Sequence, residues 1–261
     1  MNGPRLIRHE QFPSRFLRNK RDVIVYLPPG YDDRPHRRFP ILYLHDGQNL
    51  FQGSTSFIPG MDWHVGHTAD EWIENGRVEP LIIAGIYNTG RQRLNEYTPT
   101  RMSKLGGGRA NRYAKFLLEE LRPFLLGNYR ISSGAENTGI GGSSLGGLVS
   151  LYLGLRHPNI FGKIAALSPS VWWNERVILR FADASPVHPL PRIWLDIGTR
   201  EGARIVEDVE RFRDVLLRKG WQTDRNLHYE RIEGAEHNEA AWALRVGPFL
   251  QFLFPAGESR V

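Results

Sequence analysis

The chain has 261 residues, a formal net charge of +6 and no cysteine. Without cysteine there is no disulfide, thiolate nucleophile or cysteine-ligated zinc, and we expect a cytoplasmic protein. Hydrophobic residues make up 41% of the chain, but no apolar run approaches the roughly 20 residues that span a bilayer. We therefore expect no membrane partner. The polar start predicts no secretory signal, and the scattered basic residues predict no nucleic-acid partner.

The first half of the chain predicts strands interspersed with helices. Strands are expected at 22–27, 41–44 and 81–87, and the last two are apolar enough to be buried on both faces. Thr68 and Glu71 have capping-box spacing, which predicts a short helix from Thr68 to about residue 76. The polar loop from 88 to about 108 is longer than most connections, which often indicates function. Residues 111–122 form an amphipathic helix that Pro123 is expected to kink or end.

The second half continues the alternation. We expect the remaining strands at 137–142, 164–168, 193–197 and 227–232, and helices at 144–157, 205–219 and 239–254. This order predicts an α/β sandwich, with a mostly parallel central sheet and helices on both faces. No repeat or linker is apparent, so we expect a single domain over residues 1–261, with its core at about 20–254. The segment 168–191 is too short for a large lid.

Residues 141–147 read Gly-Gly-Ser-Ser-Leu-Gly-Gly and contain Gly-x-Ser-x-Gly in one frame, centred on Ser144. The stretch joins a predicted strand to a predicted helix, where such a turn exposes a serine hydroxyl above a sheet. Glycine is needed beside it because a Cβ atom would collide with neighbouring backbone. The pattern is short enough to arise by chance, so its context must decide its meaning.

A nucleophilic serine needs an imidazole to accept its proton and a carboxylate to orient that imidazole. His237 lies in a polar, glycine-containing loop after the last predicted strand and is the expected base. His228 lies inside that strand, where a structural or surface role is expected. The order serine, acid, histidine is that of the α/β-hydrolases.

The acid is expected near residues 196–208. Glu201 is favoured because it lies in the loop after the 193–197 strand, and ligand sites lie beyond the carboxyl ends of parallel strands. Asp196 lies within the strand, where a buried carboxylate with structural partners is the simplest account. Glu207 and Asp208 are further alternatives.

The oxyanion of an acyl-transfer intermediate needs two backbone N–H donors. The N–H of Leu145, directly after the serine at a helix N-terminus, is expected to be one. The N–H of Gln48 is expected to be the other, because Gly47 lets the loop after the 41–44 strand approach closely. His45 is expected to be a hydrogen-bonded scaffold residue. No histidine spacing typical of zinc is present, so we expect no metal and no other cofactor.

Five motifs follow one another along the chain, at residues 44–51 (LHDGQNLF), 141–147 (GGSSLGG), 168–173 (SPSVWW), 198–201 (GTRE) and 235–242 (AEHNEAAW). In this order they resemble the "putative esterase" family of α/β-hydrolases. The family includes esterase D-like enzymes, enterobactin-type siderophore esterases, feruloyl and acetyl-xylan esterases and the antigen 85 mycolyltransferases.

The resemblance spans about residues 20–254 and implies serine hydrolysis of carboxylic esters without a cofactor. It implies that Glu201 is the acid, because the family's acid follows Gly-Thr-x. It also implies that Gln48 is the oxyanion residue that follows His-x-Gly. Substrate varies widely within the family, so the resemblance implies no particular ester.

Five side chains are expected near the substrate. Trp172 and Trp173 follow a strand end and are expected to wall an acyl or aromatic group, with core packing as the competing account. Arg91, Arg93 and Tyr97 lie on the loop after the 81–87 strand. They are expected to contact a polar or anionic alcohol portion, with simple solvation as the competing account.

The sequence therefore predicts a serine ester hydrolase that acts on a small or medium acyl ester through a Ser-His-Glu triad and an acyl-enzyme. An acyltransferase of this fold is the nearest alternative, since it differs only in the second nucleophile. A siderophore-type or feruloyl-type esterase is a narrower alternative. A non-catalytic binding protein on a hydrolase scaffold is disfavoured, because such proteins usually lose a triad member. The oligomeric state does not follow from the sequence.

Overall fold

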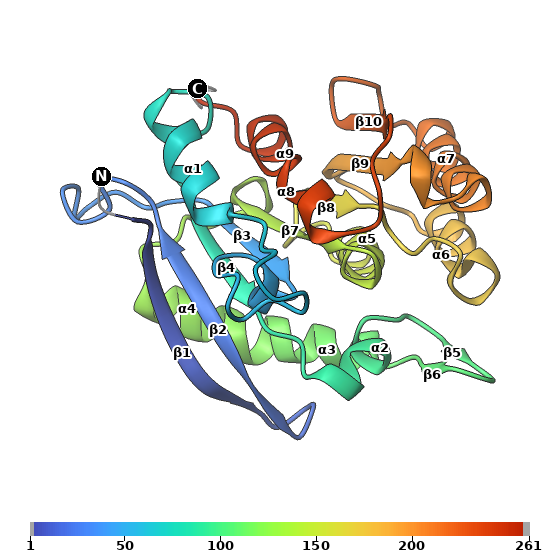
Figure 1. The fold of residues 1–261 in the computed structure, drawn as a ribbon, viewed down its shortest axis with the longest axis horizontal. Helices are drawn as coiled ribbons and strands as arrows, with labels where there is room; N and C mark the ends of the chain where they lie inside the picture. The colour runs from blue at the N-terminus through green and yellow to red at the C-terminus, as the bar shows by residue number, and fades with distance from the viewer. Residues whose placement is uncertain (1–2, 258–261) are drawn as a thin grey trace.

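The computed structural model describes residues 3–257 and is organised around an eight-stranded sheet of order β1-β2-β4-β3-β7-β8-β9-β10 (Figure 1). The hairpin of β1 (Arg5–Ser14) and β2 (Asn19–Leu27) is antiparallel, and β2 also runs antiparallel to β4 (Ile82–Ile86). The other pairs are parallel, which confirms the predicted mostly parallel sheet. They involve β3 (Ile41–His45), β7 (Thr138–Ser143), β8 (Lys163–Leu167), β9 (Arg192–Gly198) and β10 (Leu227–Ile232).

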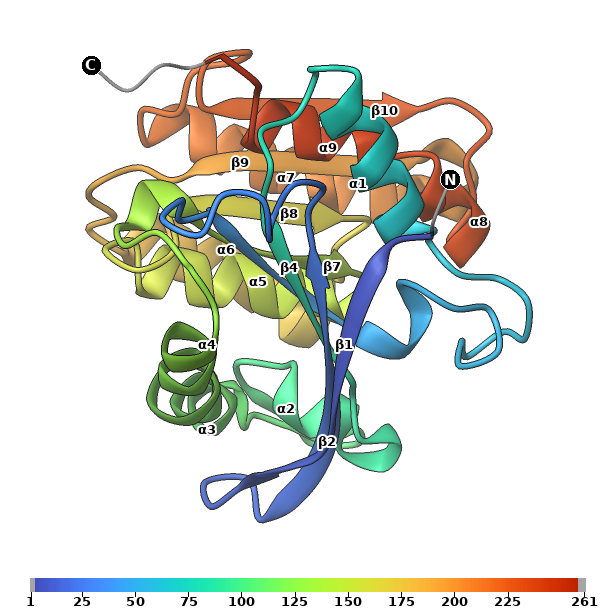
Figure 2. The same ribbon diagram turned by 90° about the vertical axis from the view of Figure 1, so that its left-hand side faces the viewer.

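Helices cover both faces of the sheet, as predicted (Figure 2). Alternate strand residues enter two separate cores, so that Val23 and Val25 belong to one and Ile24 and Tyr26 to the other. The first core is closed by α5 (Leu145–Arg156), α6 (Trp173–Ala184) and α7 (Ala203–Arg218). The second is closed by α1 (Val65–Glu74) and α9 (Val246–Leu253). No helix in residues 3–257 is long and apolar enough to cross a membrane.

Several boundaries differ from the predictions. Helix α1 begins at Val65, three residues before the predicted cap, and the Val65 N–H donates to Leu50 O at 2.9 Å. The predicted 239–254 helix is two helices, α8 (Glu239–Ala243) and α9. Neither β1 nor α6 was predicted.

Pro123 does not end its helix. Helix α3 (Ala110–Lys115) passes through a π-helical segment, Phe116–Leu121, into α4 (Arg122–Asn128). Pro123 follows directly after the π-helical segment, where the regular α-helical hydrogen-bond pattern is already interrupted and a missing N–H is tolerated.

A buried ion pair fixes the long loop after β4 to the sheet. Arg21 on β2 donates from Nη2 to both carboxylate oxygens of Glu96, each at 3.0 Å, and the two side chains are 0% and 3% exposed. Glu96 ends α2 (Arg93–Glu96), and the Arg21 guanidinium lies 4.7 Å from the centre of the Phe116 ring. Arg93 begins the same short helix that Glu96 ends, so this buried ion pair also helps to fix the position of Arg93.

We expect Glu96→Ala to lower the free energy of unfolding by about 3 to 5 kcal/mol, because it leaves a buried guanidinium without its counter-ion. Urea unfolding measures the change. Glu119→Ala is the matched control, since Glu119 is exposed on the neighbouring π-helical segment and should cost under about 0.5 kcal/mol. Equal losses for the two variants would contradict the role of the Arg21 pair.

Candidate active site

Ser144 occupies a strained turn between β7 and α5. Its φ and ψ are 57° and −122°, a left-handed backbone conformation that residues with a Cβ rarely adopt. Three backbone hydrogen bonds of 3.0 Å hold it there: its N–H donates to Leu167 O, and its carbonyl accepts from the N–H groups of Leu148 and Ser170. Strand β8 and helix α5 thus fix the serine from both sides.

Glycines make this turn sterically allowed. A Cβ on Gly142 would lie 3.1 Å from the carbonyl carbon of Gly146, and one on Gly146 would lie 3.2 Å from the Cβ of His45. A Cβ on Gly147 would lie 3.1 Å from Gly142 O and 3.2 Å from Leu167 O. Because several of these neighbours are backbone atoms of the sheet, they have little freedom to move away.

The predicted acid and base are hydrogen-bonded. Glu201 follows β9 and His237 follows β10, so adjacent parallel strands deliver both to the same edge of the sheet. The His237 Nδ1 lies 2.6 Å from Glu201 Oε2, and the two side chains are 43% and 1% exposed. The carboxylate is therefore sealed in the protein while the imidazole reaches the surface.

The environment of Glu201 favours its ionised form. Burial alone would raise the pKa of Glu201, but hydrogen bonds from His237, Ser168 and the Gly198 N–H outweigh it and lower the pKa. Ser168 Oγ donates to Glu201 Oε1 at 2.6 Å, and the Gly198 N–H donates to the same oxygen at 2.9 Å. With Oε1 occupied in this way, Oε2 is directed at His237.

Ser144 and His237 line the same pocket, of about 440 Å³. Ser144 Oγ lies 3.3 Å from Ser170 Oγ, and within residues 3–257 it has no hydrogen bond to His237. Nucleophile–base hydrogen bonds are often long without substrate and shorten when it binds. The structure thus brings the predicted serine, acid and histidine to one place, with the serine–histidine contact still open.

Asp196 has other partners than His237. It is 0% exposed, and its oxygens accept from Arg245 Nη1 at 2.6 Å, Trp194 Nε1 at 2.7 Å and the Ser168 N–H at 3.1 Å. Burial raises the pKa of Asp196, and the Arg245 charge partly offsets that rise. Its surroundings match the structural account of this residue given by the sequence.

Ser168 connects the two buried carboxylates, because its N–H donates to Asp196 and its hydroxyl donates to Glu201. The hydroxyl also accepts from Arg245 Nη1 at 2.9 Å and from Trp242 Nε1 at 3.1 Å. The Arg245 side chain is 3% exposed, and its Nη2 lies 3.9 Å from Glu201 Oε1. One buried arginine therefore faces both Asp196 and Glu201.

The two N–H groups that are expected to be oxyanion donors belong to Leu145 and Gln48, of which Gln48 is among the pocket-lining residues. Leu145 begins α5, and the first N–H groups of a helix have no partner inside it. Gln48 lines the pocket in the 3₁₀ turn Gly47–Asn49, and no hydrogen bond to its N–H is found in the described part of the chain. Gly47 is required there, because a Cβ would lie 2.5 Å from the carbonyl carbon of Gly85.

The ion pair between Asp46 and Arg93 stabilises the start of the Gly47–Asn49 turn. Asp46 has a φ of 58° and is bound by Arg93 through two hydrogen bonds, Nε to Oδ1 at 2.8 Å and Nη2 to Oδ2 at 2.7 Å. Asn88 Nδ2 donates to Oδ1 at 2.7 Å, and the Asn88 N–H donates to Gln48 Oε1 at 3.3 Å. Although burial opposes it, the guanidinium lowers the pKa of Asp46, so the pair remains charged.

His45 is a scaffold residue, as expected. It is 0% exposed, and burial lowers its pKa to about 3, so the ring is neutral. Its Nδ1 lies 3.0 Å from the Tyr113 hydroxyl.

The five side chains expected near the substrate fall into three groups. Arg93 lines the pocket. Tyr97 is 0% exposed and packs on His45, 5.1 Å between ring centres, so it supports the turn from within the core. Trp173 is also 0% exposed, and its Nε1 donates to Thr100 O at 2.9 Å, as the core-packing account predicted. Trp172 and Arg91 are exposed and lie outside the pocket walls.

A loop that begins after Leu50 supplies an apolar wall that the sequence did not predict. Phe57 and Ile58 line the pocket, and Phe57 is 82% exposed. The loop closes on itself where the Gly60 N–H donates to Gly53 O at 2.9 Å. It is tied to the 3₁₀ turn Gly47–Asn49 by the Phe57 N–H, which donates to Asn49 Oδ1 at 2.9 Å.

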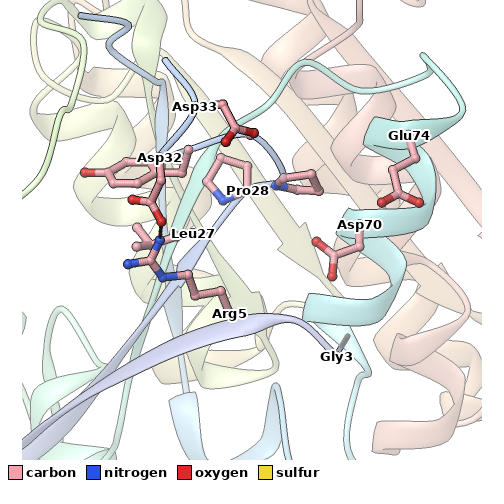
Figure 3. Close-up of a pocket in the computed structure, with 11 residues that line it drawn as sticks. Gly3, Arg5, Leu27, Pro28, Asp32, Asp33, Asp70 and Glu74 are labelled. Carbon is pink, nitrogen blue, oxygen red and sulfur yellow. Dashed lines mark hydrogen bonds and ion pairs between the residues drawn. The ribbon is translucent and has the colours of Figure 1, made fainter. Parts of the chain in front are cut away.

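A second pocket, of about 370 Å³, lies near the C-terminal end of β2 and contains none of the predicted site residues (Figure 3). Its walls carry four carboxylates, of which Asp32 pairs with Arg5 and Asp70 accepts the Tyr26 hydroxyl at 2.6 Å. Because β2 runs antiparallel to its neighbour β4, this pocket and the Ser144 pocket are at opposite ends of the sheet. Within residues 3–257 no group of three or more histidine, aspartate or glutamate side chains is arranged to hold a metal ion.

Sequence reasoning missed Ser168, Arg245 and Glu239. Ser168 lies in a quoted motif, and an arginine within the apolar 239–254 stretch was a signal for a buried charge that needs a partner. Glu239 lies two residues after the predicted base, yet nothing in the sequence indicates that it faces the pocket.

Comparisons with known proteins agree with this architecture. The model of the family described as "Putative esterase" matches residues 14–250. The uncharacterised protein YbbA of Bacillus subtilis is 26% identical over 94% of this chain and 97% of its own length. The siderophore triacetylfusarinine C esterase of Aspergillus fumigatus is 30% identical over 67% of this chain and 60% of its own. A solved ferulic acid esterase superposes with a TM-score of 0.75 at 18% identity, over 97% of this chain and 99% of that chain.

We expect Arg245→Met to destabilise the protein in a pH-dependent way. Without the guanidinium, the already raised pKa of the buried Asp196 rises further, so the folded variant binds a proton over a wider pH range. Its stability deficit relative to wild type should grow as pH rises above the wild-type pKa of Asp196, and shrink as pH falls below it.

Urea unfolding from about pH 4 to about pH 8 tests this sign. Arg204→Met, which removes an exposed arginine of α7, is the control and should show no such trend. A deficit that is constant with pH would contradict the pairing of Arg245 with Asp196.

Proposed function

Because the chain belongs to the putative esterase family, we propose that it is a carboxylic ester hydrolase with Ser144 as its nucleophile. The observation that carries the proposal is the 2.6 Å contact between His237 Nδ1 and Glu201 Oε2, in the pocket that Ser144 also lines. A buried, ionised carboxylate bound to a half-exposed imidazole beside a strained serine is the arrangement that acyl transfer requires.

In the proposed reaction, Glu201 accepts the Nδ1–H of His237 and so leaves Nε2 as the proton acceptor. His237 takes the proton of the Ser144 hydroxyl while Ser144 Oγ attacks the ester carbonyl. It then gives that proton to the departing alcohol. A water molecule, activated by the same imidazole, releases the acid from the acyl-enzyme. The lowered pKa of Glu201 supports its part, because it stays ionised while the imidazolium forms.

The oxyanion is proposed to bind the N–H groups of Leu145 and Gln48. Helix α5 begins at Leu145, so its partial positive end adds to the first donor. The Arg93–Asp46 pair and Asn88 hold the turn that presents the second donor. Preorganised donors stabilise a developing charge without the cost of reorienting them during the reaction.

A small-molecule ester is the proposed substrate. The relatives named above act on a siderophore and on ferulic acid esters, by their descriptions, and both kinds of ester are candidates here. The pocket of about 440 Å³ has apolar walls at Phe57, Ile58 and Trp242, which suit an acyl or aromatic group. That the chain is one domain and that it is cytoplasmic remain predictions from the sequence.

We expect a serine-directed phosphonate to label the wild-type protein and not Ser144→Ala. Mass spectrometry should find the adduct on Ser144. Hydrolysis rates for acetyl, butyryl, octanoyl and feruloyl esters and for a trilactone siderophore would show which kind of ester is preferred. Ser143→Ala is the matched control, because Ser143 is the adjacent pocket residue and should leave labelling intact. A folded wild-type protein that is neither labelled nor hydrolytic would overturn the proposal.

Glu201→Ala should lower kcat by about 10³-fold to 10⁴-fold, since the imidazole then lacks its orienting carboxylate. Asp196→Asn should instead lower the free energy of unfolding, because it deprives Arg245 of its counter-ion, while the folded fraction keeps kcat within about tenfold. Steady-state kinetics together with thermal unfolding separates the two effects. The reverse pattern would make Asp196 the acid.

A further inference from the structure

The charges in the walls of the Ser144 pocket do not balance. Apart from His237, the ionisable side chains that line it are Asp46, Arg93 and Glu239. Asp46 and Arg93 neutralise each other through their two short hydrogen bonds. Glu201 is 1% exposed, is already engaged with His237 and is not among the lining residues. The remaining wall charge is the carboxylate of Glu239.

Glu239 has little compensation inside the protein. It is 6% exposed, and its one hydrogen bond is from Asn49 Nδ2 to Oε1 at 3.2 Å. In the described part of the chain no lysine, arginine or histidine forms an ion pair with it, and its Oε2 has no hydrogen-bond partner. The guanidinium of Arg93 attracts Glu239 at longer range but is hydrogen-bonded to Asp46. A mostly buried carboxylate without an ion pair of its own therefore gains from a positive charge that enters the pocket.

The surrounding walls suit such a guest. Phe57, Ile58 and Trp242 line the same pocket as Glu239. Trp242 is 5% exposed, since its indole N–H donates to Ser168 and its ring packs on His237 and Trp63. Phe57, which is 82% exposed, is the aromatic wall that is open to a ligand. Aromatic rings beside a carboxylate bind cations through both the ring quadrupole and the full charge.

We propose that Glu239 makes this pocket select esters that carry a positively charged group and disfavour esters that carry a carboxylate. The inference rests on the proposed ester hydrolysis and adds the charge of the substrate to it. From the sequence, Arg93 was expected to contact a polar or anionic part of the substrate. Its guanidinium is instead hydrogen-bonded to Asp46. The inference also means that the pocket has the opposite sign to the chain as a whole, whose net charge is +6.

Three acetate esters of nearly equal size test the selectivity. Their alcohols are choline, its uncharged isostere 3,3-dimethylbutanol, and 3-hydroxypropanoate. For the wild type we expect kcat/KM to be about tenfold higher for the cationic ester than for the neutral one, and about tenfold lower for the anionic one. Salt should move both ratios towards unity, because it screens the attraction or repulsion of a charged ester as it approaches the pocket.

Glu239→Gln keeps the shape of the side chain and removes its charge. We expect it to bring both ratios to within about threefold of unity, with the neutral ester as the reference in each ratio. Glu236→Gln is the matched control: its carboxylate lies close by in sequence, is 57% exposed, pairs with Arg200 at 3.7 Å and does not line the pocket. Wild-type ratios that Glu239→Gln leaves unchanged would overturn the inference.

Equilibrium binding separates this inference from the proposed function. The same three esters can be titrated into Ser144→Ala with and without Glu239→Gln, so that no turnover is needed. A preference for the cationic ester that depends on Glu239 supports the inference even if wild-type protein hydrolyses nothing. Hydrolysis of all three esters without any charge preference supports the proposed function and rejects the inference.

Discussion

The backbone at Ser144 can take its left-handed conformation because no side chain occupies the space between β7, α5 and the turn after β3. Gly142, Gly146 and Gly147 leave that space empty, and the atoms that a Cβ would meet belong to the sheet, the helix and His45. The strain at Ser144 is therefore supported by packing that three elements share. The same close approach lets β3 end beside the start of α5, so the Gly47–Asn49 turn and Ser144 are positioned together.

Two buried carboxylates lie on the other side of the pocket, and their environments separate their roles. Glu201 has a lowered pKa because hydrogen bonds to its charged form outweigh burial, whereas Asp196 has a raised pKa because burial prevails despite Arg245. The hydroxyl of Ser168 joins both environments through Arg245. Diverging pKa values of neighbouring acids are a physical sign of different functions.

Sequence patterns predicted the parts of the site that follow strand ends. Ser144, Glu201 and His237 each lie directly beyond a parallel strand, and topology alone brings such positions to one edge. Strand β1 was missed because polar and apolar residues are mixed along it. It is an edge strand and pairs with β2 alone in the eight-stranded sheet. A position in a loop does not predict which way its side chain points. Arg93 and Tyr97 are only four residues apart, yet Arg93 lines the pocket and Tyr97 lies in the core. The direction of a side chain depends on packing from distant segments, as with Arg21 and Glu96.

The loop that carries Phe57 and Ile58 is closed at its base by the Gly53–Gly60 hydrogen bond and joined to the Gly47–Asn49 turn through Asn49. The hydroxyls of Thr55 and Ser56 also anchor it, because both donate to Gln48 O, at 2.7 and 3.5 Å. The side chains of Phe57 and Ile58 at its tip form none of these hydrogen bonds. Substrate range and catalytic competence are in that sense separable traits. Descendants of this chain can diversify the tip, or a laboratory can randomise it, while the reaction geometry is inherited unchanged.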